Sequence, residues 1–363
     1  MKSGAAFPRT VMRDAFTNRF ARARPFAFLG AFLLSACVSG SPAASTPGES
    51  AISSTPSEAP GSAPPNLAGR IVFTRAGGSF GDDTVFTANA DGTDEHQLSD
   101  LGEGCCPWAT RDDERVLYST LAPDGRVTTA TVNFDGSNRF VIALPDDALN
   151  LGPGPFSPDG TQIAFEGFGD EAHPEVNGIY IGSADGTNLV QITHDHVLPG
   201  DWSPDGTRLL VFRDPDGYQP TTGPFGLVEP PLPGSLFIVN VDGSEEHKLT
   251  PDQVAVPCCW NYRWSPDGSR ILFADKDGVL WLINPDGTDL TQLFIDAKVV
   301  HVRRYAMFPT WSPDGSQVMF ALDVVPNPFD TSPNGLYVID ADGTGLTFVI
   351  GGVNFKREPS WMP

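Results

Sequence analysis

The sequence is poor in basic side chains, in long apolar runs and in helical periodicity. It has 23 Lys and Arg against 45 Asp and Glu, which gives a formal net charge of -22. A surface of that sign repels phosphate backbones, so nucleic acid is not expected as a partner. The apolar run at 26–36 is too short to span a bilayer stably. No long stretch places apolar residues at helical spacing, and 38 Gly and 34 Pro indicate many turns, so we predict an all-β fold.

One turn motif recurs along the chain. Ser-Pro-Asp-Gly occurs at 157–160, 203–206, 265–268 and 312–315, each time directly after Phe or Trp. Proline fixes the backbone at the second position of a type I turn, and glycine takes the left-handed conformation at the fourth. Apolar residues flank each copy, so the motif predicts a hairpin with a short loop.

A second turn, Asp-Gly followed in every copy by Thr or Ser, divides the chain into six units. Successive aspartates are separated by 44, 50, 57, 44 and 56 residues, close to the roughly 40 to 50 residues of a four-stranded propeller blade. The six units predict one domain at 68–363, with the variation in spacing taken up by loops. The six aspartates are Asp91, Asp135, Asp185, Asp242, Asp286 and Asp342.

The strand after each Ser-Pro-Asp-Gly turn is apolar on both faces. At 163–165, 271–273 and 318–320 three apolar residues follow one another, so neither face of the strand would meet water. Blades stacked on both sides provide that environment, whereas a sheet with one wet face would alternate apolar and polar residues. This pattern predicts a closed ring.

The two ends of the repeat array complement each other. The first unit starts at 70–73 without a preceding inner strand, and the sequence finishes at 359–363 with an inner strand that no further unit follows. We therefore predict a six-bladed β-propeller of four-stranded blades, closed by the C-terminal strand in the first blade.

These motifs resemble a known family. The repeated Trp-Ser-Pro-Asp-Gly, the strand that follows it, and the segment Leu-Tyr-Val-Ile-Asp-Ala-Asp-Gly-Thr at 336–344 are similar to the six-bladed propeller of TolB and related WD-like β-propeller proteins. The resemblance covers 68–363 and implies the fold. Nothing resembles the separate N-terminal domain of TolB, and in the second unit the usual turn is replaced by Trp108-Ala109-Thr110-Arg111-Asp112.

The N-terminal segment reads as a targeting signal. A basic stretch precedes the apolar run, which ends in Leu34-Ser35-Ala36-Cys37. This ending resembles the lipobox of bacterial lipoproteins, which implies a signal peptide at 1–36 and a lipid on Cys37; an ordinary signal peptide with an incidental cysteine is the alternative. Residues 37–67 are rich in Ser, Pro and Ala and form a disordered tether in this interpretation. We expect an exported bacterial lipoprotein, held to the membrane by the lipid alone and facing the periplasm or the cell exterior.

Two pairs of adjacent cysteines precede inner strands in blades 2 and 5. They are Cys105 with Cys106, and Cys258 with Cys259. Opposite blades are too far apart for a disulfide unless loops reach inward. For an exported protein we favour vicinal disulfides, although adjacent cysteines are strained in that bond. Free thiols and a four-thiolate zinc site remain as alternatives.

The variable loops are expected on the face opposite the two tight turns. They lie at 76–83, 167–177, 214–233 and 323–334, and binding residues are often carried on such loops. Candidate ligand residues lie near the same face. One group is a histidine pair that could bind a metal or form a polar loop. The other group is mostly basic and could hold an anion or only compensate the charge of nearby aspartates. These candidates are His194, His196, His301, Arg303, Arg304, Tyr305 and Arg357.

The functional expectation is a binding protein without a cofactor. We expect a monomeric, non-catalytic scaffold that binds a protein or peptide of the cell envelope through the variable-loop face. The alternative is a carbohydrate-active or other hydrolytic propeller with its site at the mouth of the central channel.

Overall fold

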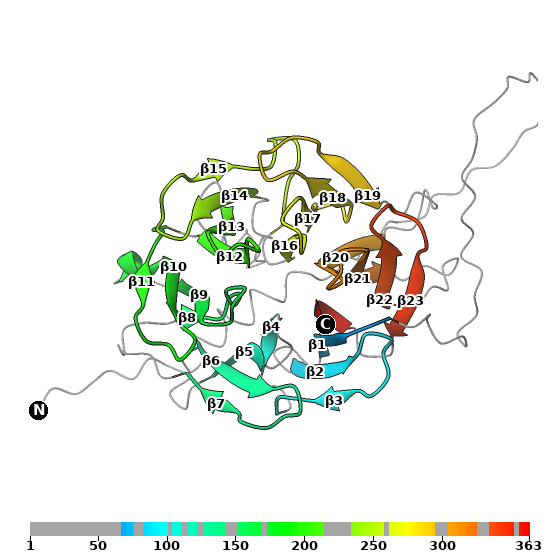
Figure 1. Ribbon diagram of the computed structural model, residues 1–363, viewed down its shortest axis with the longest axis horizontal. Helices are drawn as coiled ribbons and strands as arrows, with labels where there is room; N and C mark the ends of the chain where they lie inside the picture. Colours follow the sequence, from blue (N-terminus) through cyan, green and yellow to red (C-terminus); the bar gives the residue numbers. More distant parts are fainter. Residues whose placement is uncertain are drawn as a thin grey trace, which may run out of the picture.

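The computed structural model of the protein describes residues 67–75, 83–100, 104–110, 115–121, 127–142, 151–167, 173–195, 197–213, 234–257, 261–294, 304–324, 334–351 and 356–363. These residues form six four-stranded antiparallel sheets arranged in a ring (Figure 1). The predicted six-bladed, four-stranded propeller is therefore confirmed. No helix in these ranges is both long and apolar enough to cross a membrane.

The blades are numbered along the chain, and their strands are given from the centre outward. Blade 1 contains β24 (Lys356–Met362), β1 (Arg70–Arg75), β2 (Thr84–Asn89) and β3 (His96–Gln97). Blade 2 contains β4 (Cys105–Ala109), β5 (Arg115–Leu121), β6 (Val127–Asn133) and β7 (Phe140–Val141). Blade 3 contains β8 (Leu151–Gly152), β9 (Gln162–Gly167), β10 (Gly178–Ser183) and β11 (Val190–Gln191), with a short 3-10 helix at Pro174–Val176.

The remaining three blades follow the same order. Blade 4 contains β12 (Val197–Trp202), β13 (Arg208–Arg213), β14 (Ser235–Asn240) and β15 (His247–Lys248). Blade 5 contains β16 (Tyr262–Trp264), β17 (Ile271–Ala274), β18 (Leu280–Ile283) and β19 (Thr291–Phe294). Blade 6 contains β20 (Arg304–Trp311), β21 (Gln317–Val324), β22 (Gly335–Asp340) and β23 (Thr347–Gly351). We call the four strands of each blade A to D from the centre outward.

The Ser-Pro-Asp-Gly motif forms the A–B turn. In blade 4 the Gly206 N–H donates to the Ser203 carbonyl, and the Asp205 carboxylate accepts the backbone N–H and the hydroxyl of Thr207. Gly206 has φ of 72°, the left-handed region that glycine tolerates best. Gly206, Gly268 and Gly315 each lie beside the proline of the preceding turn, as Gly206 does beside Pro158, so the A–B turns of blades 3 to 6 adjoin one another.

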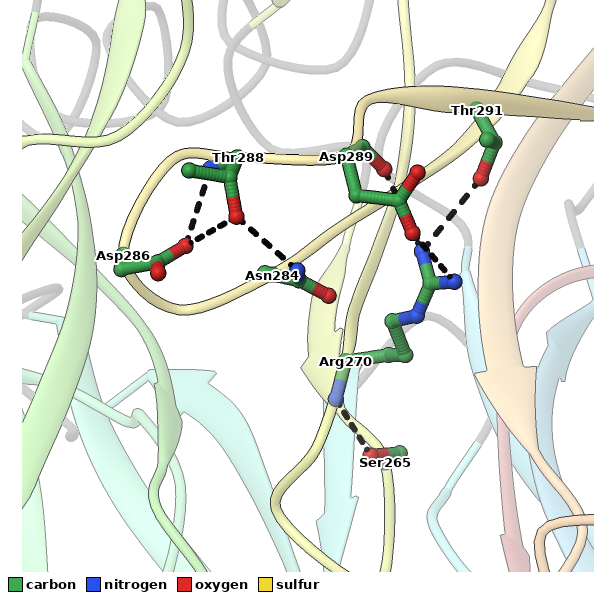
Figure 2. A network of polar contacts seen from close by, with 7 residues as sticks. All are labelled: Ser265, Arg270, Asn284, Asp286, Thr288, Asp289 and Thr291. Carbon is green, nitrogen blue, oxygen red and sulfur yellow. Dashed lines mark hydrogen bonds and ion pairs between the residues drawn. The ribbon is translucent and has the colours of Figure 1, made fainter.

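The Asp-Gly motif forms the C–D turn, on the same face as the A–B turns because the strands are antiparallel. Figure 2 shows the example in blade 5, where the Asp286 carboxylate accepts the backbone N–H and the hydroxyl of Thr288. Arg270, at the start of the B strand, forms an ion pair with Asp289 at 2.8 Å and donates to the Thr291 hydroxyl. The side chains of the turn thus hold the B and D strands together across the blade.

The core is made of interfaces between blades. The B-strand residues at 163–165, 271–273 and 318–320 are fully buried, as the apolar pattern predicted. The residues of β17 divide between two clusters: Ile271 and Phe273 pack in one, and Leu272 packs in another with Val318 and Phe320 of blade 6. Each sheet is therefore covered on both sides by its neighbours.

The ring is closed by β24, which pairs antiparallel with β1. Trp361 is buried, and its indole N–H donates to the Ala68 carbonyl at 2.9 Å. It packs with Ile71 and Phe73 of blade 1 and with Met319 of blade 6. Strands from the two ends of the described chain thus complete one blade, which confirms the predicted closure.

Trp361→Ala is expected to destabilise the ring strongly. Truncation of a buried tryptophan typically costs about 3–5 kcal/mol, and here it also removes the hydrogen bond to Ala68. Urea unfolding measures the change. Val190→Ala, at a side chain that is 60% exposed, is the control and should change stability by about 0.5 kcal/mol or less. A protein lacking 356–363 that was as soluble and stable as the intact chain would contradict the closure.

Asp205→Asn is expected to lower the melting temperature by an amount that depends on pH. The hydrogen bond from the Ser203 hydroxyl, and then that from the Thr207 backbone, lower the pKa of Asp205 to about 2. Because the unfolded-state pKa is higher, about 3.9, the carboxylate stabilises the folded state above about pH 4 and loses that contribution as the pH falls towards 2. Calorimetry should show a difference of about 1–2 °C from the natural protein at neutral pH that shrinks below pH 4.

Asp100→Asn serves as the charge control, because Asp100 is an exposed carboxylate outside the turns. Comparing the two variants separates the turn hydrogen bonds from the general effect of removing one negative charge. If the melting temperatures of Asp205→Asn and the natural protein differed by the same amount down to pH 2, the hydrogen bonds would not stabilise the ionised form of Asp205.

Candidate binding site at the centre of the ring

The A strands share a backbone irregularity near their first residues, on the face away from the tight turns. Four of them, in blades 1, 2, 4 and 6, shift register against the B strand near this point, which marks a β-bulge. Four residues that are not glycine adopt left-handed φ here, between 54° and 57°, each three residues before the place of the repeat tryptophan. They are Cys106, Asn261, Phe308 and Glu358.

Left-handed backbone at a residue other than glycine costs on the order of 1 kcal/mol or more, and it tends to persist where a side chain must be held in a set direction. Proline occupies the same place in blades 3 and 4, at Pro153 and Pro199, and its ring excludes positive φ. The left-handed residue, and not the register shift, therefore distinguishes four blades of the ring from the other two.

Glu358 shows what the bulge achieves. Its side chain is only 7% exposed, and its Oε2 accepts the backbone N–H of Cys106 at 2.9 Å and the Thr74 hydroxyl at 3.4 Å. Glu358 and Cys106 are both bulge residues, and they belong to neighbouring inner strands. A buried carboxylate thus ties blade 1 to blade 2 at the start of both A strands.

Deeper in the ring, one side chain reaches across the centre. The guanidinium carbon of Arg263, on β16 of blade 5, lies 3.9 Å from the ring centroid of Trp108, on β4 of blade 2. Arg263 is 6% exposed, and its Nη1 donates to the Gly200 carbonyl of blade 4 at 3.1 Å. Blades 2 and 5 are opposite each other in a ring of six, so this contact spans the centre of the ring.

A carboxylate from blade 4 connects to the same region. Asp201 accepts the backbone N–H of Trp202 through Oδ1 and that of Trp264 through Oδ2, both at 2.9 Å. Trp202 and Trp264 are the repeat tryptophans of blades 4 and 5, and Asp201 and Arg263 each directly precede one of them. Asp201 and Arg263 thus occupy the same position of the repeat, the residue directly before the tryptophan.

The alignment of the second unit needs a correction of one residue. The Thr110 N–H donates to the Arg115 carbonyl, as the Ser203 N–H does to that of Arg208 in blade 4. Ala109 thus occupies the place of the repeat tryptophan, and Trp108 occupies the place before it. A match by residue type alone puts Trp108 in the wrong position and conceals its place opposite Arg263.

The predicted cysteine pairs are only partly within the described chain. Cys105 pairs with Ser119 in the β4–β5 ladder, and Cys106 is half-buried at its bulge. Cys258 and Cys259 lie outside the described residues, so the vicinal disulfides stay a prediction. Cys37 also lies outside them.

The other predicted ligand residues are divided among separate blades. His194 is exposed in the connection to β12, and Tyr305 is half-buried on β20, against Gly278 of blade 5. Arg304 and Arg357 are placed by backbone pairing only, opposite Val324 and Thr74. His196, His301 and Arg303 lie outside the described residues, as does most of the four variable loops.

Sequence reasoning missed Arg263, Trp108 and Asp201. A usable signal was present, because each occupies the position before the repeat tryptophan, where the six units differ in charge and size. The series is Ser360, Trp108, Pro155, Asp201, Arg263 and Thr310. Residues that vary at a fixed inner position of a repeat are candidates for contact with a ligand.

The chemistry of the centre suits binding. A guanidinium offers several N–H donors in one plane, and an indole offers an apolar face, a combination common at binding hot spots. In the ranges that the structure covers, no group of three or more His, Cys, Asp or Glu side chains is placed to hold a metal ion.

Six four-stranded blades, a C-terminal strand that completes the first of them, and Asp-Gly turns on one face define a TolB-like six-bladed β-propeller fold. Comparison with family models and with curated protein sequences gives no match. Comparison with solved structures gives many.

Two of these structures are TolB proteins. TolB from Acinetobacter baumannii is 18% identical with a TM-score of 0.60, over 83% of this chain and 68% of that one. A putative TolB from Agrobacterium tumefaciens is 16% identical with a TM-score of 0.56, over 81% of this chain and 99% of that one. The hydrazine synthase of Kuenenia stuttgartiensis is 13% identical with a TM-score of 0.57, over 82% of this chain and 47% of that one. At such identities the likeness shows the fold alone.

The contact between Arg263 and Trp108 is expected to give a measurable coupling energy. A cation–π pair contributes about 0.5–1 kcal/mol at exposed sites and about 2 kcal/mol when desolvated, and this one is buried. A double-mutant cycle of Arg263→Met and Trp108→Leu should therefore give about 1–2 kcal/mol in urea unfolding.

Arg208→Met combined with Trp108→Leu is the matched control, because Arg208 lies over the Trp264 ring instead. That control cycle should be additive to within about 0.5 kcal/mol. Equal coupling in the two cycles would mean that Arg263 and Trp108 do not interact across the ring.

Proposed function

We propose that the protein is a lipid-anchored, non-catalytic propeller of the cell envelope that binds a protein or peptide. The binding surface is the face that carries the B–C and D–A connections, opposite the tight turns. On the tight-turn face the C–D turns repeat the same backbone hydrogen bonds in all six blades, whereas the opposite face differs from blade to blade in loop length and in the left-handed residues.

The contact between Arg263 and Trp108 is the observation that carries this proposal. It places a cation beside a half-buried aromatic side chain at the centre of the ring, so a ligand that approaches along the axis meets positive charge next to an apolar surface. A peptide segment that ends in acidic side chains or exposed carbonyl groups would complement the positive charge of Arg263. The approach from the bulge side is lined by residues of several blades, which favours an extended ligand over a small one.

The anchor is supported by the sequence around Cys37. Residues 34–37 match a lipobox directly after an apolar run, and the tether at 37–67 has the composition of a flexible chain. A tether of that length has an end-to-end distance of about 30 Å, enough to present either face of the propeller towards partners near the membrane.

Crosslinking in intact cells tests both parts of the proposal. We expect the natural protein in the membrane fraction with a discrete crosslinked partner, and Cys37→Ser in the soluble fraction. Arg303→Glu, which reverses a charge close to the start of the inner strand β20, should reduce the crosslinked product several-fold, because the proposed ligand is attracted to positive charge there.

Lys248→Glu is the matched control, since it makes the same charge change on the outer strand β15, away from the centre. It should leave the crosslinked product unchanged. Membrane retention of Cys37→Ser would refute the lipid anchor, and equal loss of product in both charge variants would refute the binding face.

A further inference from the structure

The outermost strands of four blades are short, and each pairs with its C strand through the same pattern of hydrogen bonds. β3, β7, β11 and β15 each contain two residues, and the residue after each strand donates its N–H inward to the C strand at 2.8 Å. In an antiparallel ladder, the residue before such a donor directs its own N–H and C=O away from the sheet. These outward-facing residues are Gln97, Val141, Gln191 and Lys248.

Three of these four residues protect the edge with a polar side chain. The Gln97 amide donates to the Ser99 carbonyl at 2.7 Å, and the Gln191 amide donates to the carbonyl oxygens of Glu175 and Asn177 at 3.0 Å. Lys248 forms an ion pair with Asp252. Polar or charged residues at an edge strand are a known means of preventing a further strand from pairing there.

β7 of blade 2 lacks this protection. Its outward-facing residue is Val141, 46% exposed, and the residue before it is Phe140, 45% exposed. In the part of the chain that the structure covers, the one other large apolar side chain with comparable exposure is Val190 of the neighbouring β11. The equivalent positions in blades 1 and 4 are histidines. β7 is thus the one of the four short edges that presents two adjacent apolar side chains beside outward-facing backbone groups.

Charges of both signs lie around β7, since Arg70 interacts electrostatically with Asp135, and the acidic excess is that of the whole chain. Asp135 is exposed in the turn that leads into β7, and the equivalent turns of the two flanking blades carry Asp91 and Asp185. Arg139, directly before β7, is folded back onto Tyr118, with Nε donating to the tyrosine hydroxyl at 2.7 Å. Hydrogen bonds within the turns lower the pKa of all three aspartates, so they are ionised at neutral pH.

A second copy of this chain is a poor occupant for the edge. Each chain has a formal charge of -22, so two copies repel each other. The net charge and the three aspartates instead complement a basic partner.

We propose that β7 is a strand-addition site for an extended segment of another protein, in which β-branched residues pair with Phe140 and Val141 and Lys or Arg lies beside them. Main-chain hydrogen bonds to the outward-facing groups of Val141 supply the pairing, and the apolar side chains and the acidic turns supply the selectivity. This surface is on the outer rim, separate from the proposed binding face at the centre.

The test uses the full-length protein and a labelled peptide, acetyl-Lys-Val-Thr-Val-Thr-Val-Lys-amide, with binding measured by fluorescence anisotropy at low salt. We expect saturable binding that Val141→Lys weakens about ten-fold or more, because the lysine blocks the edge and repels the peptide. Gln97→Lys adds the same charge at the equivalent edge in blade 1 and should leave the affinity unchanged. A melting curve for each variant confirms that the fold is retained.

Two further peptides separate the contribution of main-chain hydrogen bonds to binding from that of charge. Methylation of alternate backbone nitrogens, which removes the donors needed for pairing, should abolish binding, and replacing both lysines by glutamate should weaken it. The proposal is overturned if the natural protein does not bind the first peptide at up to about 1 mM. It is equally overturned if the methylated peptide binds as well, or if Val141→Lys and Gln97→Lys have the same effect. Self-association of the natural protein that Val141→Lys abolishes, seen by sedimentation, would assign the edge to a second copy instead.

Discussion

The structure depends on the burial of both faces of the B strands. A strand such as β17, with Ile271 and Phe273 on one side and Leu272 on the other, has no surface that tolerates water. Each blade must therefore lie between two others, and the only arrangement of a finite number of blades that meets this condition everywhere is a ring. The pairing of β24 with β1 meets the condition for the first and last blades together.

Closing the ring brings residues that are distant in sequence to one axis. Glu358 on β24 contacts Cys106 on β4, and Arg263 on β16 contacts Trp108, again on β4. The first contact joins neighbouring blades and the second spans opposite ones. The centre of the molecule is consequently an assembly of side chains from all around the ring, which fits recognition of a ligand better than a site within any single blade.

The sequence predicts the architecture well because the turns are local. Ser-Pro-Asp-Gly and Asp-Gly set their own backbone conformations within four to six residues. The three consecutive apolar residues of each B strand indicate that both faces of the strand are buried. The bulges and the contact between Arg263 and Trp108 could not be predicted in this way. Left-handed φ at Phe308 or Glu358 arises from tertiary packing, against the local preference of these residue types. The two partners of the central contact, Trp108 and Arg263, are 155 residues apart in the sequence. In the second unit, where the turn motif is lost, matching by residue type placed Trp108 one position too late.

The position of β24 also has a consequence for biosynthesis. Blade 1 contains the earliest described strand, β1, and is completed by the latest one, so the ring cannot close until β24 has been synthesised. Until then the chain is an open array whose first blade lacks its innermost strand. Until β24 joins β1, the apolar side chains of blades 1 and 6 that surround Trp361 in the closed ring lack this partner.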